Sequence, residues 1–345
     1  MTTSVDVHDP RVDPEPDGWA AFRAAHRPHA VWDYALMGVE SLAARSPGLL
    51  AVARRGGEVV AAVSVTVGSP RGTVPGPVGG LARWGPRWVE VHQPWLSGFP
   101  GWVFADSLPA AARRDVLRAV ERAVCRFVGP GCLGVLYRYV PAEDEHLVAG
   151  TGRVVRPAMG ASVLDNAFAD VEGWIRSLAR SRRHSIRGQI RKVAAADDLA
   201  RRFAPGRDDL DGAELAGLLH RHRAKFGDVP FDWRSPVSAR YLDALVRRPD
   251  VVTGTYHDRA GRLLAFTTIL DHPVVPLHQH WAALGPDEGG RRHLYFDAFA
   301  EVVRHMIDRG AAAVSSGRGL GEVKESLGFT VRPRRVAVAP RPVCR

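Results

Sequence analysis

The chain has 345 residues, a formal net charge of +10, 46% hydrophobic residues and 24% charged residues. This length allows two domains of ordinary size, and the composition is that of a globular protein without an apolar run near the roughly 18 residues of a membrane helix. The acidic, proline-rich start does not resemble a secretory signal. Cys125, Cys132 and Cys344 have neither metal-binding nor disulfide spacing, so we expect a location in the reduced cytoplasm.

Taken in chain order, apolar periodicity and helix-breaking residues predict alternating helices and strands. The first ordered element is expected near Trp19. Helices are expected at residues 19–26, 31–45, 109–127, 171–196, 211–226, 238–247 and 295–309, with a short one around Lys324. Strands are expected at residues 49–54, 58–67, 84–92, 133–139, 251–257, 262–270, 278–284 and 311–315.

The predicted order of elements repeats once. The hairpins at residues 49–67 and 251–270 each follow helices, and each precedes further strand, a long helix, a glycine stop and a short strand. The predicted fold class is therefore α/β (α+β), with two tandem units that are each a mixed sheet flanked by helices. We expect an N-terminal domain at residues 1–160 and a C-terminal domain, with the active site, at residues 161–345.

The stretch of residues 291–329 is the best patterned part of the chain. Its helix has an apolar stripe opposite a polar face, formed respectively by Tyr295, Phe299, Val302 and Met306 and by Asp297, Glu301, Arg304 and Asp308. Gly310 ends this helix, and a small-residue strand, a turn rich in arginine and glycine, and a short helix follow. In α/β units such a succession places a site at the carboxyl end of the strand.

Lys324 lies in that short helix, directly after the turn that contains Arg318. Only three of the 47 basic residues are lysines, and a lysine differs from an arginine by its compact ammonium, whose pKa shifts readily. Two interpretations remain open: Lys324 contacts an oxyanion or a phosphate, or it is a surface lysine.

The helix at residues 171–196 concentrates positive charge. At about 100° per residue, one arc of about 80° contains Arg176, Arg180, Arg183, Arg187 and Arg191. No acidic residue lies between Ile175 and Ala196, so the repulsion within the row is unrelieved and phosphates would relieve it. An anion-binding or RNA-binding surface and an ordinary solvated face both remain open. Arg182 lies on the apolar side, where we expect it to face a carboxylate or a substrate.

Four aromatic residues or histidines are further candidates. Tyr295 begins the long helix, either as a core residue or with its hydroxyl in a cleft. Trp233, His280 and Trp281 line a pocket or pack in the core. His278 and His280 are predicted to share one strand face, but a third ligand is not apparent and we expect no metal. The sequence contains no nucleophile elbow, P-loop, zinc-protease or dinucleotide motif.

Three segments together resemble a known family. They read SLARSRRHSIRGQIRKV at residues 177–193, HWAALGPDEGGRRHLYFDAFAEVVRHMIDRGAAAVSSG at residues 280–317 and GEVKESLGF at residues 321–329. With the repeated architecture, they resemble the Fem-type (FemABX-like) subgroup of the GNAT-fold acyltransferases, which contain two GNAT domains. The resemblance implies tandem GNAT-like domains with the active site in the second.

The resemblance also implies a reaction, namely the transfer of an aminoacyl group from charged tRNA to an amine of a small molecule or peptide, in natural-product or cell-wall biosynthesis. Lys324 and Tyr295 would then be catalytic. The residues implied in binding tRNA or substrate are Arg180, Arg182, Arg183, Arg187, Arg191, Trp233, His280, Trp281 and Arg318. Aminoacyl-tRNA would be a co-substrate, and no cofactor, metal or membrane is expected.

One segment departs from the ordinary GNAT pattern. Acetyl-CoA-dependent members have R/Q-x-x-G-x-G/A before the long helix, where this chain has GGRRHL at residues 289–294. This departure argues against acetyl-CoA as the donor. Two alternatives stay open, an acyl-CoA-dependent N-acetyltransferase and a non-catalytic protein that binds RNA or another anion.

Overall fold

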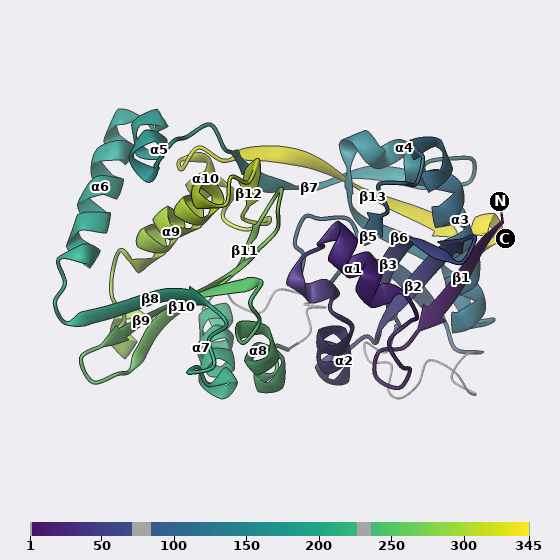
Figure 1. The fold of residues 1–345 in the computed structure, drawn as a ribbon, viewed down its shortest axis with the longest axis horizontal. Coiled ribbons are helices and arrows are strands. Elements are labelled where there is room, and N and C mark those ends of the chain that lie inside the picture. The colour runs from purple at the N-terminus through teal and green to yellow at the C-terminus, as the bar shows by residue number, and fades with distance from the viewer. Residues whose placement is uncertain (1, 71–83, 226–235, 345) are drawn as a thin grey trace. The chain divides into compact units, whose positions relative to one another are not determined.

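The computed structural model describes residues 2–70, 84–225 and 236–344 (Figure 1). The chain divides into two compact units. Unit 1 contains the described residues of Met1–Gly160 and Pro333–Arg345, and unit 2 contains those of Ala161–Asp232 and Val237–Arg332. The C-terminal residues 333–344, which we had assigned to the second domain, therefore pack in unit 1. None of the described helices is both long and apolar enough to cross a membrane.

Unit 1 is built on a mixed sheet with the strand order β1-β2-β3-β4-β6-β13. These strands are Thr3–His8, Gly48–Arg55, Glu58–Gly68, Arg87–Val91, Cys132–Pro141 and Thr330–Pro340, and the short β5, Trp102–Phe104, pairs with β3. Its helices are α1 Trp19–His26, α2 Tyr34–Ala43, α3 Ala110–Val128 and α4 Glu145–Val148. Strands β4 and β6 are parallel. The predicted hairpin of β2 and β3 is confirmed, and its two-residue turn has positive φ at Gly56 and Gly57, as a type I′ turn requires.

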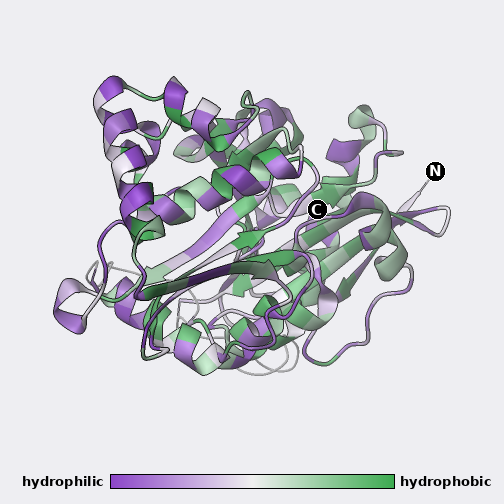
Figure 2. Cartoon of the chain, turned by 60° about the vertical axis from the view of Figure 1, so that its left-hand side comes forward, coloured by the Kyte–Doolittle hydropathy of each residue, from purple (hydrophilic) through white to green (hydrophobic). Residues whose placement is uncertain are grey.

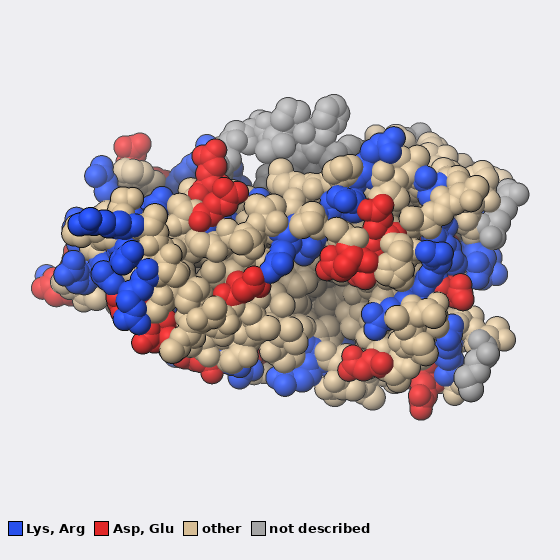
Figure 3. All heavy atoms as spheres, turned by 90° about the horizontal axis from the view of Figure 1, so that it is seen from above, with Lys and Arg blue, Asp and Glu red and all other residues tan. Residues whose placement is uncertain are grey.

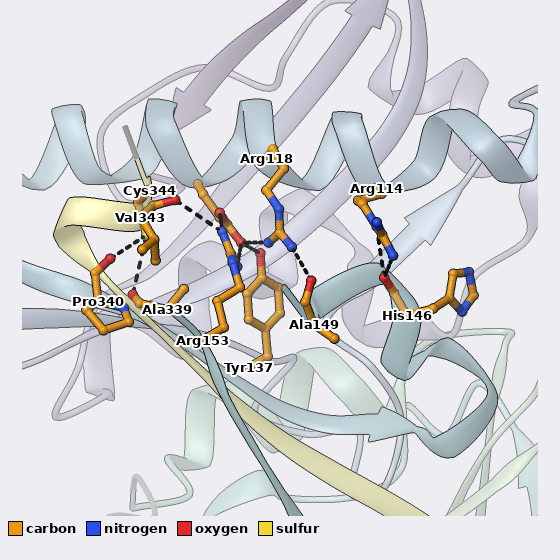
Figure 4. A network of polar contacts seen from close by, with 11 residues as sticks. Arg114, Arg118, Tyr137, His146, Ala149, Arg153, Ala339, Pro340, Val343 and Cys344 are labelled. Carbon is orange, nitrogen blue, oxygen red and sulfur yellow. Dashed lines mark hydrogen bonds and ion pairs between the residues drawn. The ribbon is translucent and has the colours of Figure 1, made fainter. Parts of the chain in front are cut away.

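The core of unit 1 includes a charged cluster on α3. Glu121 is almost fully buried, and its carboxylate accepts hydrogen bonds from Arg118 at 2.7 Å, from Tyr137 at 2.5 Å and from Arg153 at 2.6 and 2.7 Å. Figure 4 shows these three side chains converging below α3. Arg153 also donates to the carbonyl oxygen of Val343, so the cluster fastens the C-terminal segment to unit 1.

The strands of unit 2 are also mixed and follow the order β7-β12-β11-β10-β9-β8. These strands are Val154–Asp165, Ala313–Ser315, Leu277–Ala283, Leu263–Leu270, Val251–Asp258 and Leu199–Pro205. Its helices are α5 Val171–Ser177, α6 Arg180–Ala194, α7 Gly212–Ala224, α8 Ala239–Val246, α9 Leu294–Asp308 and α10 Gly321–Glu325. In Figure 1, α5, α6, α9 and α10 lie on one side of these strands and α7 and α8 on the other. Strands β11 and β12 are parallel, as β4 and β6 are in unit 1.

Residues are sorted by hydropathy in the expected way (Figure 2), with apolar residues along the strands and on the inward faces of the helices. In unit 2 the inward face of α9 joins α5, α6 and β10 in one apolar core that includes Trp174, Ile186, Phe299 and Leu327. This packing holds the turn between β12 and α10 against a rigid base.

Five strands were not predicted from the sequence: β1, the short β5, β7, β8 and β13. Strands β7, β8 and β13 are rich in charged or exposed residues and lack a clean apolar alternation, so their pairing with neighbouring strands decides their conformation. The predicted single helix at residues 171–196 is also wrong. Leu178 and Ala179 are extended, with ψ of 161° and 146°, because Leu178 turns into the core between α5 and α6.

Candidate active site

Lys324 is a buried cation on α10. The side chain is inward and only 5% of the residue is exposed, so the interpretation as a surface lysine is wrong. Its ammonium donates a hydrogen bond to the carbonyl oxygen of Ser316 and makes no other hydrogen bond or ion pair within the described part of the chain. Burial lowers the pKa of Lys324 to about 8. A buried ammonium without a carboxylate partner is the kind of group that oxyanion-binding or phosphate-binding sites use.

A chain of hydrogen bonds begins at the other side of Ser316. The Ser316 hydroxyl lies 3.2 Å from Nδ1 of His278, and Nε2 of His278 lies 2.8 Å from the hydroxyl of Thr267. Thr267 itself donates to the carbonyl oxygen of His280 at 2.8 Å. Because the single hydroxyl proton of Thr267 goes to that carbonyl, His278 donates from Nε2 and accepts at Nδ1. Burial and the nearby Lys324 lower the pKa of His278 to about 3, so the ring is neutral.

A β-bulge in β11 turns His278 toward this chain of bonds. Thr268 of β10 pairs with His280 and Ile269 pairs with His278, which leaves Gln279 as the extra residue. The prediction that His278 and His280 share one strand face is therefore wrong, because a bulge reverses the alternation of side chains. The ring of His278 packs against Phe299 of α9 at 4.9 Å. His280 belongs to the opposite face, where burial and Arg223 of α7 lower its pKa to about 3.

Tyr295 and Trp281 lie in an aromatic group on the α9 side of the sheet. The ring of Tyr295 contacts Trp281 and Phe296 at 5.4 Å and Phe299 at 4.9 Å. Its hydroxyl has no hydrogen-bond partner among the described residues, and burial raises its pKa to about 12. Tyr295 is thus a packed residue that still presents a protonated hydroxyl.

Asp297, which was predicted to lie on the polar face of α9, is buried there. Its carboxylate is fully buried and accepts hydrogen bonds from Arg201 at 2.8 and 2.9 Å and from Tyr256 at 2.8 Å. Arg201 belongs to β8 and Tyr256 to β9, so two strands cover the polar face of α9 at Asp297, while Arg304 and Asp308 on the same face stay exposed. Because β8 was not predicted, the burial of Asp297 could not be either.

The predicted row of arginines is divided and partly paired. Arg176 lies on α5, separated from the others by the break before α6. Arg187 forms an ion pair with Glu172 of α5, so the predicted absence of a compensating acid is wrong. The guanidinium of Arg182 lies over the ring of Phe296, 5.6 Å from its centre, and forms no ion pair with a carboxylate of the described residues.

The remaining cations of α5 and α6 form a surface group. Exposed members are Arg176, Arg180, Arg191 and Lys192. Figure 3 shows blue side chains gathered at the end of unit 2 that holds these helices. Arg183 is half-buried and donates to the carbonyl oxygen of Leu178 at 3.4 Å. We call the four exposed residues the α5–α6 basic surface.

Comparison with known proteins assigns the fold. Residues 180–325 match the family described as acetyltransferase (GNAT) domain. FemX is 10% identical, with a TM-score of 0.62 over 98% of this chain and 97% of FemX. L-PGS from Bacillus licheniformis is 12% identical, with a TM-score of 0.57 over 94% and 92%. A tandem GNAT protein from the clavulanic acid biosynthesis pathway is 15% identical, with a TM-score of 0.50 over 98% of both chains.

The chain has the Fem-type GNAT fold. The predicted fold class and the resemblance to this group are thereby confirmed. No curated protein matches the sequence significantly.

In this GNAT fold, the segment before α9 is where a pyrophosphate loop would be expected. Here Glu288 accepts the Gly285 N–H at 2.7 Å and pairs with Lys225 at 3.3 Å, while Arg291 pairs with Asp198. Glu288 and Arg291 of this segment are thus engaged with charged residues from elsewhere in unit 2. A β-carbon at Gly290 would lie 2.2 Å from the carbonyl oxygen of Leu284, so this glycine serves close backbone packing inside the segment.

Among the other predicted site residues, Arg318 lies half-buried in the turn between β12 and α10, near Lys324 in sequence. Trp233 lies outside the described residues. The sequence did not single out Ser316 and Thr267, since an isolated serine or threonine carries no pattern. His278 had been considered only for a metal, and among the described residues no group of three His, Cys, Asp or Glu side chains could hold one.

Proposed function

We propose that this protein is an aminoacyltransferase that forms an amide bond by transferring an aminoacyl group from charged tRNA to an amine. The observation that supports the proposal most directly is the buried ammonium of Lys324, which has no counter-charge in the described part of the chain. FemX and L-PGS, which have the same fold, are consistent with aminoacyl chemistry. We further propose that the acceptor is a small molecule or peptide of natural-product or cell-wall biosynthesis, and that the reaction is cytoplasmic.

The chemistry needs little basic strength from the protein. The tRNA ester is already activated, and an α-amine with a pKa near 8 is partly neutral at pH 7. The amine nitrogen attacks the ester carbonyl carbon, the bond to the ribose oxygen breaks, and that oxygen takes up the proton that the amine loses, directly or through water. Negative charge develops on the carbonyl oxygen in between, and the ammonium of Lys324 stabilises it. The free hydroxyl of Tyr295 donates a hydrogen bond that orients the substrate.

The tRNA would bind to the α5–α6 basic surface. Four exposed cations predict a slope of about −2.8 to −3.6 in a plot of log affinity against log salt concentration. Arg182 and Arg183 extend this surface toward α9, since the guanidinium of Arg182 already lies over Phe296. Arg318 and Trp281 are proposed to complete the binding of substrate, and Trp233 stays a candidate from the sequence alone. His280 lies on the opposite face of the sheet and is left out of this proposal.

The direct test is incubation of the protein with charged tRNA and a panel of amines, followed by mass spectrometry of the products. We expect an amide whose formation stops when the tRNA is digested with ribonuclease beforehand. The matched control is uncharged tRNA with the free amino acid, which should give no product. An equal yield without charged tRNA would disprove the proposal.

The match of residues 180–325 to the acetyltransferase domain family favours a second candidate, an acyl-CoA-dependent N-acetyltransferase. The ion pairs that Glu288 and Arg291 form with Lys225 and Asp198 occupy the charged groups before α9, and this argues against it. Calorimetric titration with coenzyme A separates the two, since micromolar binding supports the acetyltransferase and no binding removes it. A protein that binds tRNA but forms neither product would be the non-catalytic alternative.

A further inference from the structure

The position of the Lys324 ammonium depends on one acceptor. A lysine side chain rotates about four bonds, and here the carbonyl oxygen of Ser316 is the single hydrogen-bond acceptor found for it among the described residues. The direction of that carbonyl therefore sets where the charge lies. Ser316 directly follows β12, outside the regular pairing of the strand, so its peptide needs other contacts to hold its direction.

The Ser316 peptide is held from two sides. On the backbone side, its N–H donates to the carbonyl oxygen of Ser162 at 2.9 Å, and the N–H of Ser162 donates to the carbonyl oxygen of Gly317 at 2.8 Å. Two further hydrogen bonds hold the peptide: the Gly317 N–H, in the same peptide group as the Ser316 carbonyl, donates to Oγ of Ser315 at 3.3 Å, and the Ser316 hydroxyl donates to Nδ1 of His278 at 3.2 Å. The bond to His278 is the one that ties Ser316 to β11, and its removal would loosen the peptide.

His278 is itself fixed in the form that can accept this bond. Thr267 binds Nε2 at 2.8 Å and thereby selects the tautomer with a bare Nδ1, while Phe299 packs against the ring edge. The bulge at Gln279 is what brings the ring to this face of the sheet. A protonated ring would lose the acceptor at Nδ1 and would place a second cation near Lys324.

We propose that His278 is a positioning residue, which aims the Lys324 ammonium by holding the Ser316 peptide through the hydroxyl of Ser316. This inference rests on the proposed role of Lys324. It explains the bulge and the hydrogen bonds that link Ser316, His278 and Thr267, an arrangement that would otherwise suggest a serine nucleophile. A neutral histidine whose pKa lies near 3 is too weak a base to activate Ser316, and no carboxylate pairs with it in the described parts of the chain.

Two variants of His278 separate positioning from packing. In His278→Asn, the amide oxygen takes the place of Nδ1 and can still accept from Ser316. In His278→Gln, the amide reaches the place of Nε2 and can still bind Thr267, but the acceptor for Ser316 is lost. Ser316→Ala removes the same hydrogen bond from the other end without changing the ring.

The first measurement does not need the transferase reaction. Competitive labelling of amines over a pH series, read by mass spectrometry, gives the pKa and reactivity of Lys324, with the half-exposed Lys225 as internal reference. We expect His278→Gln and Ser316→Ala to increase the labelling of Lys324 about ten-fold and to move its pKa from about 8 toward the usual 10.5, because a released side chain reaches water. His278→Asn should stay close to the wild type.

The second measurement is turnover. We expect about a ten-fold fall in kcat with little change in KM for His278→Gln and Ser316→Ala, and a smaller fall for His278→Asn. If His278→Asn and His278→Gln behave alike in labelling and turnover, the ring only fills space and the positioning role is wrong. If labelling changes as expected while Lys324→Ala retains full turnover, the positioning role stands and the proposed function of Lys324 fails.

Discussion

The two units differ in whether the charged side chains at equivalent places of their folds have a partner of opposite charge. Each has a parallel pair of strands joined through a long helix, α3 in unit 1 and α9 in unit 2, and each helix carries a buried carboxylate. Glu121 is bound by two arginines and Tyr137, and Asp297 by Arg201 and Tyr256. These carboxylates are compensated, and so they stabilise the association of helix and sheet and are not available to a ligand.

The difference lies in the short helix that follows each parallel strand. In unit 1 this helix is α4, where Glu145 pairs with Arg335 at 2.7 Å. In unit 2 it is α10, where Lys324 is buried without a carboxylate in the described part of the chain. Because a buried charge without a partner is costly, its presence on α10 and not on the counterpart α4 supports the proposal that unit 2 carries the chemistry.

The largest expected effect is a loss of turnover when Lys324, the residue that distinguishes the two units, is replaced. Lys324→Ala should lower kcat for aminoacyl transfer about 10²- to 10³-fold, since an oxyanion would lose its cation. The counterpart in unit 1, Glu145→Ala, should change kcat less than about two-fold. Steady-state kinetics with charged tRNA measures both. A comparable loss in the two variants would show that the units do not differ in this way.

Removal of the compensated carboxylates should affect folding. Glu121→Ala should lower the free energy of unfolding by about 3–5 kcal/mol, because it leaves buried arginines without a partner. Asp297→Ala should cost less, since the Arg201 side chain is 36% exposed whereas that of Arg153 is 4% exposed. Urea unfolding followed by circular dichroism measures the two values. The reverse order would contradict the comparison.

The two units should also respond oppositely to pH. Burial raises the pKa of Glu40 in unit 1 from 4.5 to about 7. The protonated Glu40 therefore stabilises the fold fully below pH 4.5, and this contribution is lost as the pH rises to about 7. The free energy of unfolding should fall by up to about 3 kcal/mol over this range. The lowered pKa of Lys324 has the opposite sign, and stability is gained between about pH 8 and 10.5. Glu40→Gln should flatten the first change in urea unfolding and leave the second.

The pH dependence of turnover gives a smaller effect. The reaction needs a charged Lys324 and a neutral acceptor amine. As the pH increases, kcat/KM should first rise because the amine loses its proton, and then fall above about pH 8 because Lys324 loses its own, by about ten-fold per pH unit. In Lys324→Arg the side chain stays charged, and the alkaline fall should disappear even though the rate is lower. An unchanged alkaline limb in this variant would assign that pKa to another group.

The smallest expected effect concerns tRNA affinity. Arg191 is exposed on α6, whereas Arg187 is paired with Glu172. Arg191→Ala should therefore reduce the salt slope of tRNA binding by about 1, and Arg187→Ala by less. Filter binding between 50 and 200 mM salt, roughly the range in which such slopes are measured, tests the difference. Equal slopes in the two variants would show that the ion pair opens when tRNA binds.

Much of unit 2 was predictable because its signals are local. Gly310 ends α9 and the hairpin of β9 and β10 surrounds a turn with Gly261, features that depend on residues close in sequence. The break between α5 and α6 was not predictable, since it follows from the burial of Leu178 among residues far along the chain. The polar strands β8 and β13 were missed for the same reason.

By itself the sequence determined the repeated order of elements, the position of Lys324 after the turn, and the resemblance to Fem-type GNAT proteins, since periodicity and short motifs encode these features. Only the tertiary structure decided which charges are compensated. The burial of Asp297 and the lack of a counter-charge at Lys324 depend on contacts between distant segments. The bulge at Gln279 gave His278 its face of the sheet, because the register of a strand is set by its partner and not by the strand alone.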